Sequence, residues 1–252
     1  DVAETLLLVI ALSMLITPLL FILYDVVSRR LEESAESREP EDEEIDEEGP
    51  VIIAGIGRFG QIVNRLVQAS GFNTVVLDHD METISVMRRF GFKGFLGDPT
   101  RPDILRAAGI DKAKVLVVAL DDPEAAIKLV RYARNLRPDL HIISRARDRT
   151  YVYRLFQAGA NDIVREMFDS SLRAGRYVLE NIGLNEFEAA EAEKMFYQHD
   201  RRTIRQLAEL WDPAKPVSEN PDYIAKAREL QKELETAFLS RPDPEEKDNS
   251  NP

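Results

Sequence analysis

The chain has 252 residues, of which 44% are hydrophobic and 31% charged, a composition typical of globular proteins rather than of disordered ones. It has no cysteine and only three histidines, which excludes disulfides, thiolate metal sites and cysteine nucleophiles, and we predict no metal site. The net charge of −12 argues against a nucleic-acid partner, because phosphate binding needs clustered lysines and arginines.

The first predicted element is a hydrophobic helix near the N-terminus. Residues 5–24 are uncharged and mostly Leu, Ile and Val, and as a helix they would span about 30 Å, the thickness of a bilayer's hydrocarbon core. We predict a transmembrane helix over 5–27, with a buried helix and an interfacial helix as alternatives. Acidic Asp1 and Glu4 argue against a secretory signal. Pro18 suits a helix bundle, in which neighbours can bond the freed carbonyl.

Charges on the two sides of this span predict its orientation. Arg29 and Arg30 follow it and acidic residues precede it, so the positive-inside rule places the residues after 28 in the cytoplasm. Because the first residue is not Met, we expect a longer protein with further membrane spans upstream of Asp1. The expected location is the inner (plasma) membrane, as a multi-pass protein.

An acidic linker follows the span. Residues 32–48 include eleven Asp or Glu and the single base Arg38, whereas from Gly49 onward 31 acidic and 30 basic residues nearly balance. We interpret 28–49 as a solvated spacer whose like charges repel one another and extend it. A specific acidic docking strip is the alternative.

A strand, a glycine loop and a helix come next. The apolar run 50–54 is followed by Gly55, Gly57 and Gly60 in the pattern Gly-x-Gly-x-x-Gly, and then by a helix over 61–68. In a dinucleotide-binding fold, such glycines allow a tight turn, approach of the backbone to a phosphate, and close packing of helix on strand. The N-terminus of the helix would offer free N–H groups to an anion.

An acidic residue ends the second predicted strand. The strand 74–77 leads into Asp78, eighteen residues after Gly60, where a dinucleotide-binding fold has the acid that bonds the ribose. The alternative role of Asp78 is to cap the next helix, 81–90, although Asp80 fits that role better. An Asp with no Arg directly after it favours a free 2′-hydroxyl over a 2′-phosphate.

Strands and helices then alternate. The segment 94–97 is followed by helices at 103–108, 123–137 and 151–158 and by strands at 115–120, 141–144 and 162–164. This order predicts an α/β fold, a Rossmann-like doubly wound parallel sheet. Ligands of such sheets bind beyond the carboxyl ends of the strands, where the sequence has polar clusters at 97–98, 119–122 and 145–148.

The sequence shows no catalytic constellation. A dehydrogenase needs a proton donor held by an orienting partner, and His79, His141 and His199 lie at strand ends or on a helix without an evident one. The residues after the last strand read as helices and a charged tail. We therefore predict that the chain is not an enzyme and that a nucleotide is sensed rather than consumed.

The combination of motifs resembles one family. The segments 51–61, 76–80, 97–100, 120–123 and 145–148 are similar to those of the C-terminal regulatory domain of Kef-type potassium/proton antiporters (CPA2 family), an RCK or TrkA-N-like domain. The similarity covers about residues 50–200. It implies the last transmembrane helix at 5–27, an acidic linker at 28–49, a Rossmann-like RCK N-terminal domain at 50–165, crossover and dimerisation helices at 166–211, and a charged tail at 212–252.

The resemblance also implies regulation of potassium conductance by an adenine nucleotide, NAD(H) or AMP. The residues implied in binding it are Gly55, Gly57, Arg58, Phe59, Gly60, Asp78, His79, Asp98, Thr100, Leu120, Asp121 and Arg145. Helices 168–181 and 186–199 would form a homodimer through residues 166–200, since Leu172, Tyr177, Val178 and Ile182 make an apolar set. The alternative is that these helices pack back on their own sheet.

Glutathione gates some members of this family. Arg65 and Arg147 resemble two of the groups that hold the peptide at the dimer interface, and Asp200 stands where those members have Asn. A carboxylate at this position would repel an anionic peptide, which argues against glutathione gating here. Two other functions are alternatives: an RCK subunit of a potassium channel or uptake system, and a membrane-tethered NAD-dependent oxidoreductase.

Overall fold

The computed structural model describes residues 48–240 without a break, and before them only positions 2, 13, 14, 16, 17, 20, 24 and 45. The span predicted at 5–27 and the linker predicted at 28–49 therefore lie almost wholly outside the described residues. Within the part of the chain that is described, no helix is both long and apolar enough to cross a bilayer. The chain divides into two compact units, 1–43 and 44–252, and the second contains all of the strands described below.

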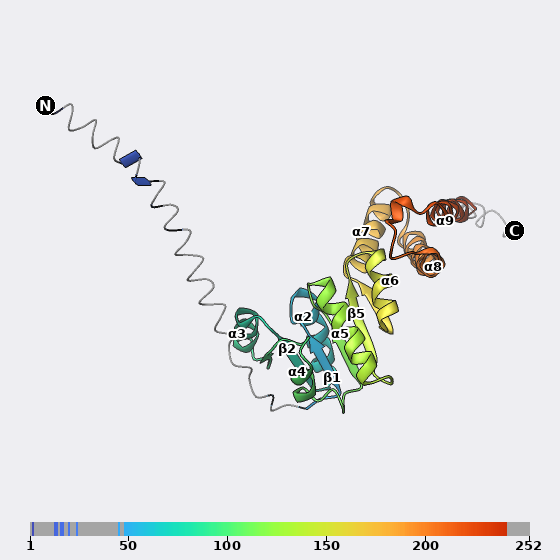
Figure 1. Ribbon diagram of the computed structural model, residues 1–252. Coiled ribbons are helices and arrows are strands. Elements are labelled where there is room, and N and C mark those ends of the chain that lie inside the picture. The colour runs from blue at the N-terminus through green and yellow to red at the C-terminus, as the bar shows by residue number, and fades with distance from the viewer. Residues whose placement is uncertain are drawn as a thin grey trace. The chain divides into compact units, whose positions relative to one another are not determined.

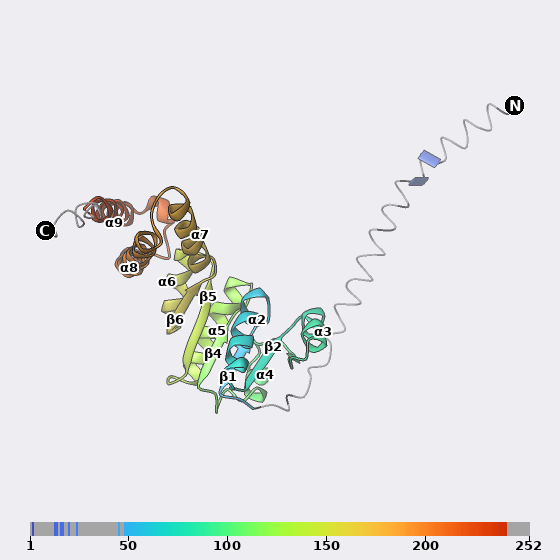
Figure 2. The same cartoon turned by 180° about the vertical axis from the view of Figure 1, so that it is seen from behind.

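Six parallel strands form one sheet in the order β3-β2-β1-β4-β5-β6 (Figures 1 and 2). They are β1 (Val51–Ala54), β2 (Thr74–Asp78), β3 (Phe95–Leu96), β4 (Val115–Val118), β5 (His141–Ala146) and β6 (Asp162–Arg165). In the central strand, Val51 pairs with Thr74 of β2 on one side and with Val115 of β4 on the other. The strand order changes direction between β1 and β4, as in a doubly wound sheet. The α/β fold class predicted from the sequence is confirmed.

Helices join consecutive strands and cover both faces of the sheet. They are α2 (Arg58–Ala69), α3 (Met81–Arg89), α4 (Pro102–Ala107), α5 (Pro123–Leu136) and α6 (Arg149–Ala158). Alternate residues of β1 point to opposite faces, so that Ile52 and Ala54 pack in a core with α4, α5 and α6, whereas Ile53 packs with α2 and α3. All three side chains are fully buried, as expected for a parallel sheet covered on both sides.

Aspartates begin three of these helices. Asp80, Asp122 and Asp148 cap α3, α5 and α6 by accepting hydrogen bonds from backbone N–H groups of the first turn. Asp80 is therefore the cap of the helix after β2, and Asp78 is left for another role.

Three further helices follow the sheet. They are α7 (Phe168–Asn181), α8 (Glu186–Leu210) and, after a short 3-10 helix η1 (Val217–Glu219), α9 (Pro221–Leu239). Helix α7 packs against α8, and α8 packs against α9 (Figures 1 and 2). An apolar cluster joins Tyr153 of α6 to Leu207 of α8 and to Tyr223 and Leu230 of α9. The C-terminal helices are thus attached to the sheet domain through α6.

The C-terminal part differs from the one expected from the sequence. Helix α8 continues to Leu210, beyond the helix expected over 186–199, and the segment interpreted as a charged tail, 212–252, contains α9. Helix α9 buries Tyr223, Leu230 and Leu234. These few apolar positions lie among many charged side chains, so the sequence pattern alone indicates a tail. Residues 241–252 lie outside the described residues.

We expect Leu207→Ala to lower the free energy of unfolding by about 2–5 kcal/mol, because the lost side chain would leave a cavity between α6, α8 and α9. Urea denaturation followed by the fluorescence of Trp211, the only tryptophan, measures this, since Trp211 packs against Tyr153. Leu239→Ala is the matched control: Leu239 is 86% exposed, and its loss should change stability by less than about 0.5 kcal/mol. Equal effects of the two substitutions would contradict a packed cluster at Leu207.

Candidate functional site

The residues predicted to bind a nucleotide lie at the carboxyl ends of the strands. Residues 55–60 follow β1, Asp78 ends β2 and His79 follows it, Asp98 and Thr100 follow β3, Leu120 and Asp121 follow β4, and Arg145 is the last but one residue of β5. Since the strands are parallel and β2, β1, β4 and β5 are neighbours, these loops share one edge of the sheet. The fold therefore brings the predicted residues to the same side of the domain.

Two positions of the loop after β1 must be glycine because other backbone atoms lie very close to them. Gly55 has φ +94°, and a Cβ there would lie 2.9 Å from the carbonyl oxygen of Ala119. A Cβ on Gly60 would lie 2.1 Å from the carbonyl oxygen of Gly55, so α2 can begin this close to the loop only because residue 60 has no side chain. A Cβ on Gly57, in contrast, would meet no atom within 4 Å. The space beside Gly57 is open where this type of loop approaches a phosphate.

The N-terminus of α2 has no side-chain cap. Gly57 occupies the N-cap position, and the first turn, which includes exposed Arg58 and partly buried Phe59, has no acidic residue. The first N–H groups of an α-helix have no acceptor within the helix. Because aspartates cap α3, α5 and α6 at the same edge, α2 differs from these three helices in leaving its N–H groups and positive dipole end to an anion.

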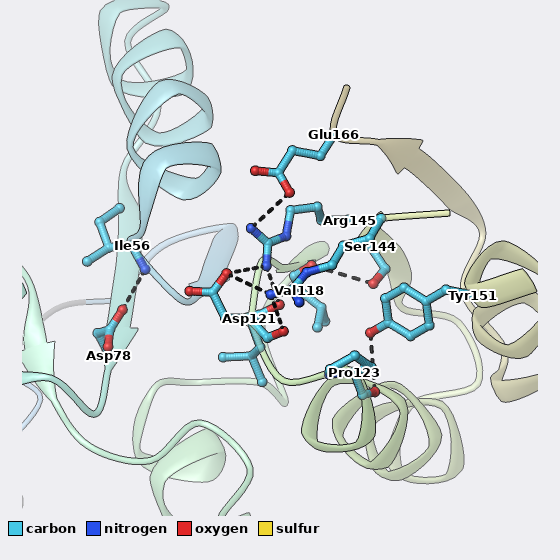
Figure 3. A network of polar contacts seen from close by, with 11 residues as sticks. Ile56, Asp78, Val118, Asp121, Pro123, Ser144, Arg145, Tyr151 and Glu166 are labelled. Atoms are coloured by element: carbon cyan, nitrogen blue, oxygen red, sulfur yellow. Dashed lines mark hydrogen bonds and ion pairs between the residues drawn. The ribbon is translucent and has the colours of Figure 1, made fainter. Parts of the chain in front are cut away.

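Asp78 is buried and supports the glycine loop. Its Oδ2 accepts a hydrogen bond from the N–H of Ile56 at 2.7 Å (Figure 3), and its Oδ1 accepts one from the N–H of Asp80 at 3.0 Å. The Asp78 side chain is 10% exposed, and the ring of His79, which is mostly exposed, lies 3.5 Å away. A carboxylate oxygen has lone pairs for a second donor. Asp78 can therefore hold the loop and accept a ribose hydroxyl at the same time.

Hydrogen bonds between Asp98 and Thr100 close the turn after β3. Asp98 Oδ1 accepts a hydrogen bond from the Thr100 N–H at 2.8 Å, and Asp98 Oδ2 accepts one from the Thr100 hydroxyl at 2.9 Å. Both side chains are partly exposed at the edge of the sheet. These contacts shape the turn and are present without a ligand.

Arg145 joins the ends of three strands. Its Nη2 donates to the Leu120 carbonyl and to Asp121 Oδ1, both at 2.7 Å, and its Nη1 lies 3.5 Å from Glu166 Oε2 (Figure 3). Arg147 Nη2 donates to the Asp121 carbonyl at 2.7 Å. Hydrogen bonding by Arg145 lowers the pKa of Asp121 below its usual value. This carboxylate therefore stays charged as the pH falls into the range where an ordinary aspartate is protonated.

The sequence prediction did not include Glu166. It follows β6 directly, and the rule that draws attention to Asp78 and Asp121, an acid at the carboxyl end of a strand, applies to it equally. Its pairing with Arg145 is a long-range contact that spacing alone does not show.

The three residues that resemble a regulatory-ligand site lie in different elements: Arg65 on an exposed face of α2, Arg147 in the loop before α6, and Asp200 within α8. Asp200 is 2% exposed and is held by Arg149 at 2.7 Å and by Arg165. Two cations therefore neutralise Asp200. The repulsion of an anionic peptide expected from the charge of Asp200 alone is therefore offset by these two arginines.

Two family models match the chain. The TrkA-N domain matches residues 51–166, and the C-terminal domain of the potassium efflux system KefB matches residues 170–251. The glutathione-regulated potassium-efflux system protein KefC of Cronobacter sakazakii is 46% identical over 208 residues, which cover 82% of this chain and 33% of the relative. The KefC protein of an Enterobacter species is 45% identical over 211 residues, with 83% and 33% covered. The chain thus spans about a third of the length of these curated relatives.

A solved structure extends the comparison to three dimensions. The C-terminal domain (CTD) of Kef from Shewanella denitrificans, in an AMP-bound form, is 39% identical with a TM-score of 0.60, and the match covers 66% of this chain and 100% of that domain. Its whole length is therefore matched at an identity that indicates common descent. The chain belongs to the Kef family of potassium efflux proteins, as a C-terminal region built from a TrkA-N domain and a KefB C-terminal domain.

Proposed function

We propose that this region is the cytoplasmic, nucleotide-sensing regulatory part of a membrane potassium/proton antiporter, in which it gates K⁺ efflux. The observation that carries the proposal is the uncapped N-terminus of α2 beside the open position at Gly57, next to Asp78. The names of the KefC relatives and the AMP-bound state of the Shewanella domain support the same reading.

The ligand that fits this edge is an adenine nucleotide, NAD(H) or AMP. Its phosphate would bind the free N–H groups of α2 beside Gly57, and its ribose would donate a hydroxyl to Asp78. Asp121, which is 76% exposed, lies beyond the end of the neighbouring strand β4 and is fixed by Arg145. The ribose side of the site is thus preformed, because Asp78 is already positioned by Ile56.

The geometry supports sensing rather than chemistry. A general acid or base works when a partner orients it toward the substrate. At this edge, Asp78, Asp98 and Asp121 are engaged in holding loops, and the exposed His79 lies beside the buried carboxylate of Asp78. Among the residues that the structure describes, no group of three or more His, Cys, Asp or Glu could hold a metal ion. The nucleotide is proposed to act by binding.

Helix α7 is proposed to form a homodimer within residues 166–200. It has no buried residue, and Met167, Val178 and Ile182, spaced along one side of the helix, are 66%, 57% and 70% exposed. Tyr177 beside them is 55% exposed. An apolar stripe of this kind is covered by association. A second copy of the chain is the partner that the proposed assembly needs.

Regulation also requires that a change in the nucleotide-binding domain reach the membrane-embedded transport unit. We propose that 5–27 spans the inner membrane, that the residues after 28 are cytoplasmic, and that the acidic spacer 28–49 carries the state of the domain to a transport unit. A ligand shifts such an equilibrium only by its different affinities for the two states. With a typical coupling energy, saturating nucleotide would change transport about 5- to 150-fold.

The nucleotide site is tested by Gly57→Asp, which places a carboxylate where the phosphate would bind. Calorimetry with AMP and with NADH should show binding to the wild type and none to the variant, while urea denaturation shows no large loss of stability because the Cβ has open space. Ala237→Asp, at an exposed position of α9 away from the glycine loop and from the stripe of α7, is the control and should bind like the wild type. Asp78→Ala is less decisive, because it also leaves the buried Ile56 N–H without its acceptor.

Two results would contradict the nucleotide proposal: no binding of AMP, NAD, NADH or ATP by the wild type, or equal binding by Gly57→Asp. The regulatory step needs its own assay, K⁺/H⁺ exchange in vesicles that hold the full-length protein, with nucleotide on the cytoplasmic side. Transport that responds identically in wild type and Gly57→Asp would leave no role for the site in gating.

The dimer is tested by Val178→Glu, which would bury a charge in the stripe of α7. We expect light scattering to show a dimer for the wild type and a monomer for the variant at micromolar concentration, because an unpaired buried charge is strongly unfavourable. Arg173→Glu, on another side of the same helix, should remain dimeric. A wild type that is monomeric with and without nucleotide would refute the assembly.

A further inference from the structure

The guanidinium of Arg145 is shared by two carboxylates with different surroundings. The Arg145 side chain is 5% exposed, whereas Asp121 is 76% exposed and Glu166 is 23% exposed. Asp121 lies beyond β4 at the edge where the proposed nucleotide binds, and Glu166 lies beyond β6 (Figure 3). Because a guanidinium is planar and its donors have fixed directions, it cannot improve its contact with one carboxylate without changing its contact with the other.

The two contacts are unequal in this structure. Arg145 donates to the Asp121 side at 2.7 Å, to the carboxylate and to the Leu120 carbonyl, but lies 3.5 Å from Glu166. The first distance is that of a strong hydrogen bond, and the second is that of an ion pair without one. A ligand group that bonds the Asp121 carboxylate would weaken the hydrogen bond between Asp121 and Arg145. The guanidinium could then move toward Glu166.

Glu166 stands at the connection to α7. Its N–H donates to the Ala146 carbonyl at 2.9 Å, and only Met167, the N-cap of α7, separates it from the first residue of that helix. Helix α7 has no buried residue and packs chiefly on α8. The direction in which α7 leaves the sheet therefore depends on this short connection.

A second link between the sheet and the helices is built differently. Asp200 of α8 is held by Arg149 at the start of α6 and by Arg165 at the end of β6, and neither arginine contacts the end of β4. This link holds α8, and Arg165 also stacks on Phe168, the first residue of α7, but the link does not include a residue of the proposed nucleotide site. The Arg145 network is the connection that reaches from Asp121 to the start of α7.

We propose that Glu166 is the positioning residue that couples ligand occupancy at the end of β4 to the orientation of α7, acting through Arg145. The proposal rests on the proposed function, because it needs a ligand at the carboxyl edge. Glu166 touches no ligand in this scheme: it sets the start of α7 according to the position of the Arg145 guanidinium. The apolar stripe of α7 would thereby be presented differently with and without nucleotide.

The chain has no cysteine, so two introduced cysteines can be labelled uniquely. We choose Lys128→Cys on α5, in the sheet domain, and Arg173→Cys on α7, the helix proposed to change its orientation. Both residues are exposed. Electron–electron double resonance on the spin-labelled full chain in detergent, diluted with unlabelled chain, gives the distance between them within one protomer. Saturating AMP or NADH should shift this distance in the wild-type background.

In Glu166→Gln we expect AMP and NADH still to bind, while the ligand-induced shift in distance is lost. Arg145→Lys should also lose the shift, because a single ammonium replaces the fork that joins the two carboxylates. Glu233→Gln is the matched control: it removes the same charge from an exposed pair between α8 and α9, and the shift should remain. Trp211 fluorescence checks that each variant is folded.

The outcomes separate the two proposals. A wild type that binds no nucleotide overturns the proposed function and this coupling with it. Nucleotide binding without any shift in distance, or an undiminished shift in folded Glu166→Gln, overturns the coupling alone and leaves the nucleotide site intact.

Discussion

The parallel direction of all six strands is the constraint on which the site depends. Each helical crossover returns the chain to the same end of the sheet, so every loop after a strand emerges at the carboxyl edge. Residues as distant in sequence as Gly55 and Glu166 are brought to one side of the domain by this rule. The change of direction between β1 and β4 then leaves room at the N-terminus of α2, where this class of fold binds its ligands.

Arginine–carboxylate contacts connect neighbouring strand ends to one another and connect the sheet to α8. Arg145 ties the end of β4 to that of β6, and Asp200 ties α8 to Arg149 and Arg165. Asp200 is 2% exposed, so burying it carries a desolvation cost and its ion pairs are weak evidence for net stability, but removing a partner of a buried charge typically costs about 3–5 kcal/mol. Their bonds are directional, and they therefore specify how α8 meets the sheet where apolar packing alone would tolerate several arrangements.

The helical part shows two different uses of apolar surface. Helix α9 covers α6 and α8 through Tyr223 and Leu230, which completes a core within the chain. The stripe of α7 at Met167, Val178 and Ile182 is exposed to solvent in the single chain. A core that closes on itself gives a fixed support, whereas an exposed stripe next to a short connection gives a surface whose presentation a ligand can change. The proposed sensing mechanism uses this contrast.

The sequence alone determined the sheet architecture and most of the candidate site. The glycine spacing, the alternation of strands and helices and the acid at Asp78 are local signals, and they predicted a Rossmann-like fold with the loops at 55–60, 97–100 and 120–121 at one edge. The bounds of the elements agreed to within two residues in the sheet domain, except that α2 begins three residues before the helix expected over 61–68. Caps such as Asp80 and Asp122 limit the elements sharply.

Only the tertiary structure decided which charged groups are partners. The sequence around Asp200 shows no partner for it, whereas in the fold α8 places it against Arg149 and Arg165. The pairing of Glu166 with Arg145 depends on β5 and β6 lying side by side. Helix α9 was missed for the same reason: its few apolar residues have meaning only against Tyr153 and Leu207. Spacing along the chain fixes local backbone geometry, because helices and strands repeat with constant periods. The partner of a buried charge or of a sparse apolar stripe depends on how elements distant in sequence pack together, and no local period contains that information.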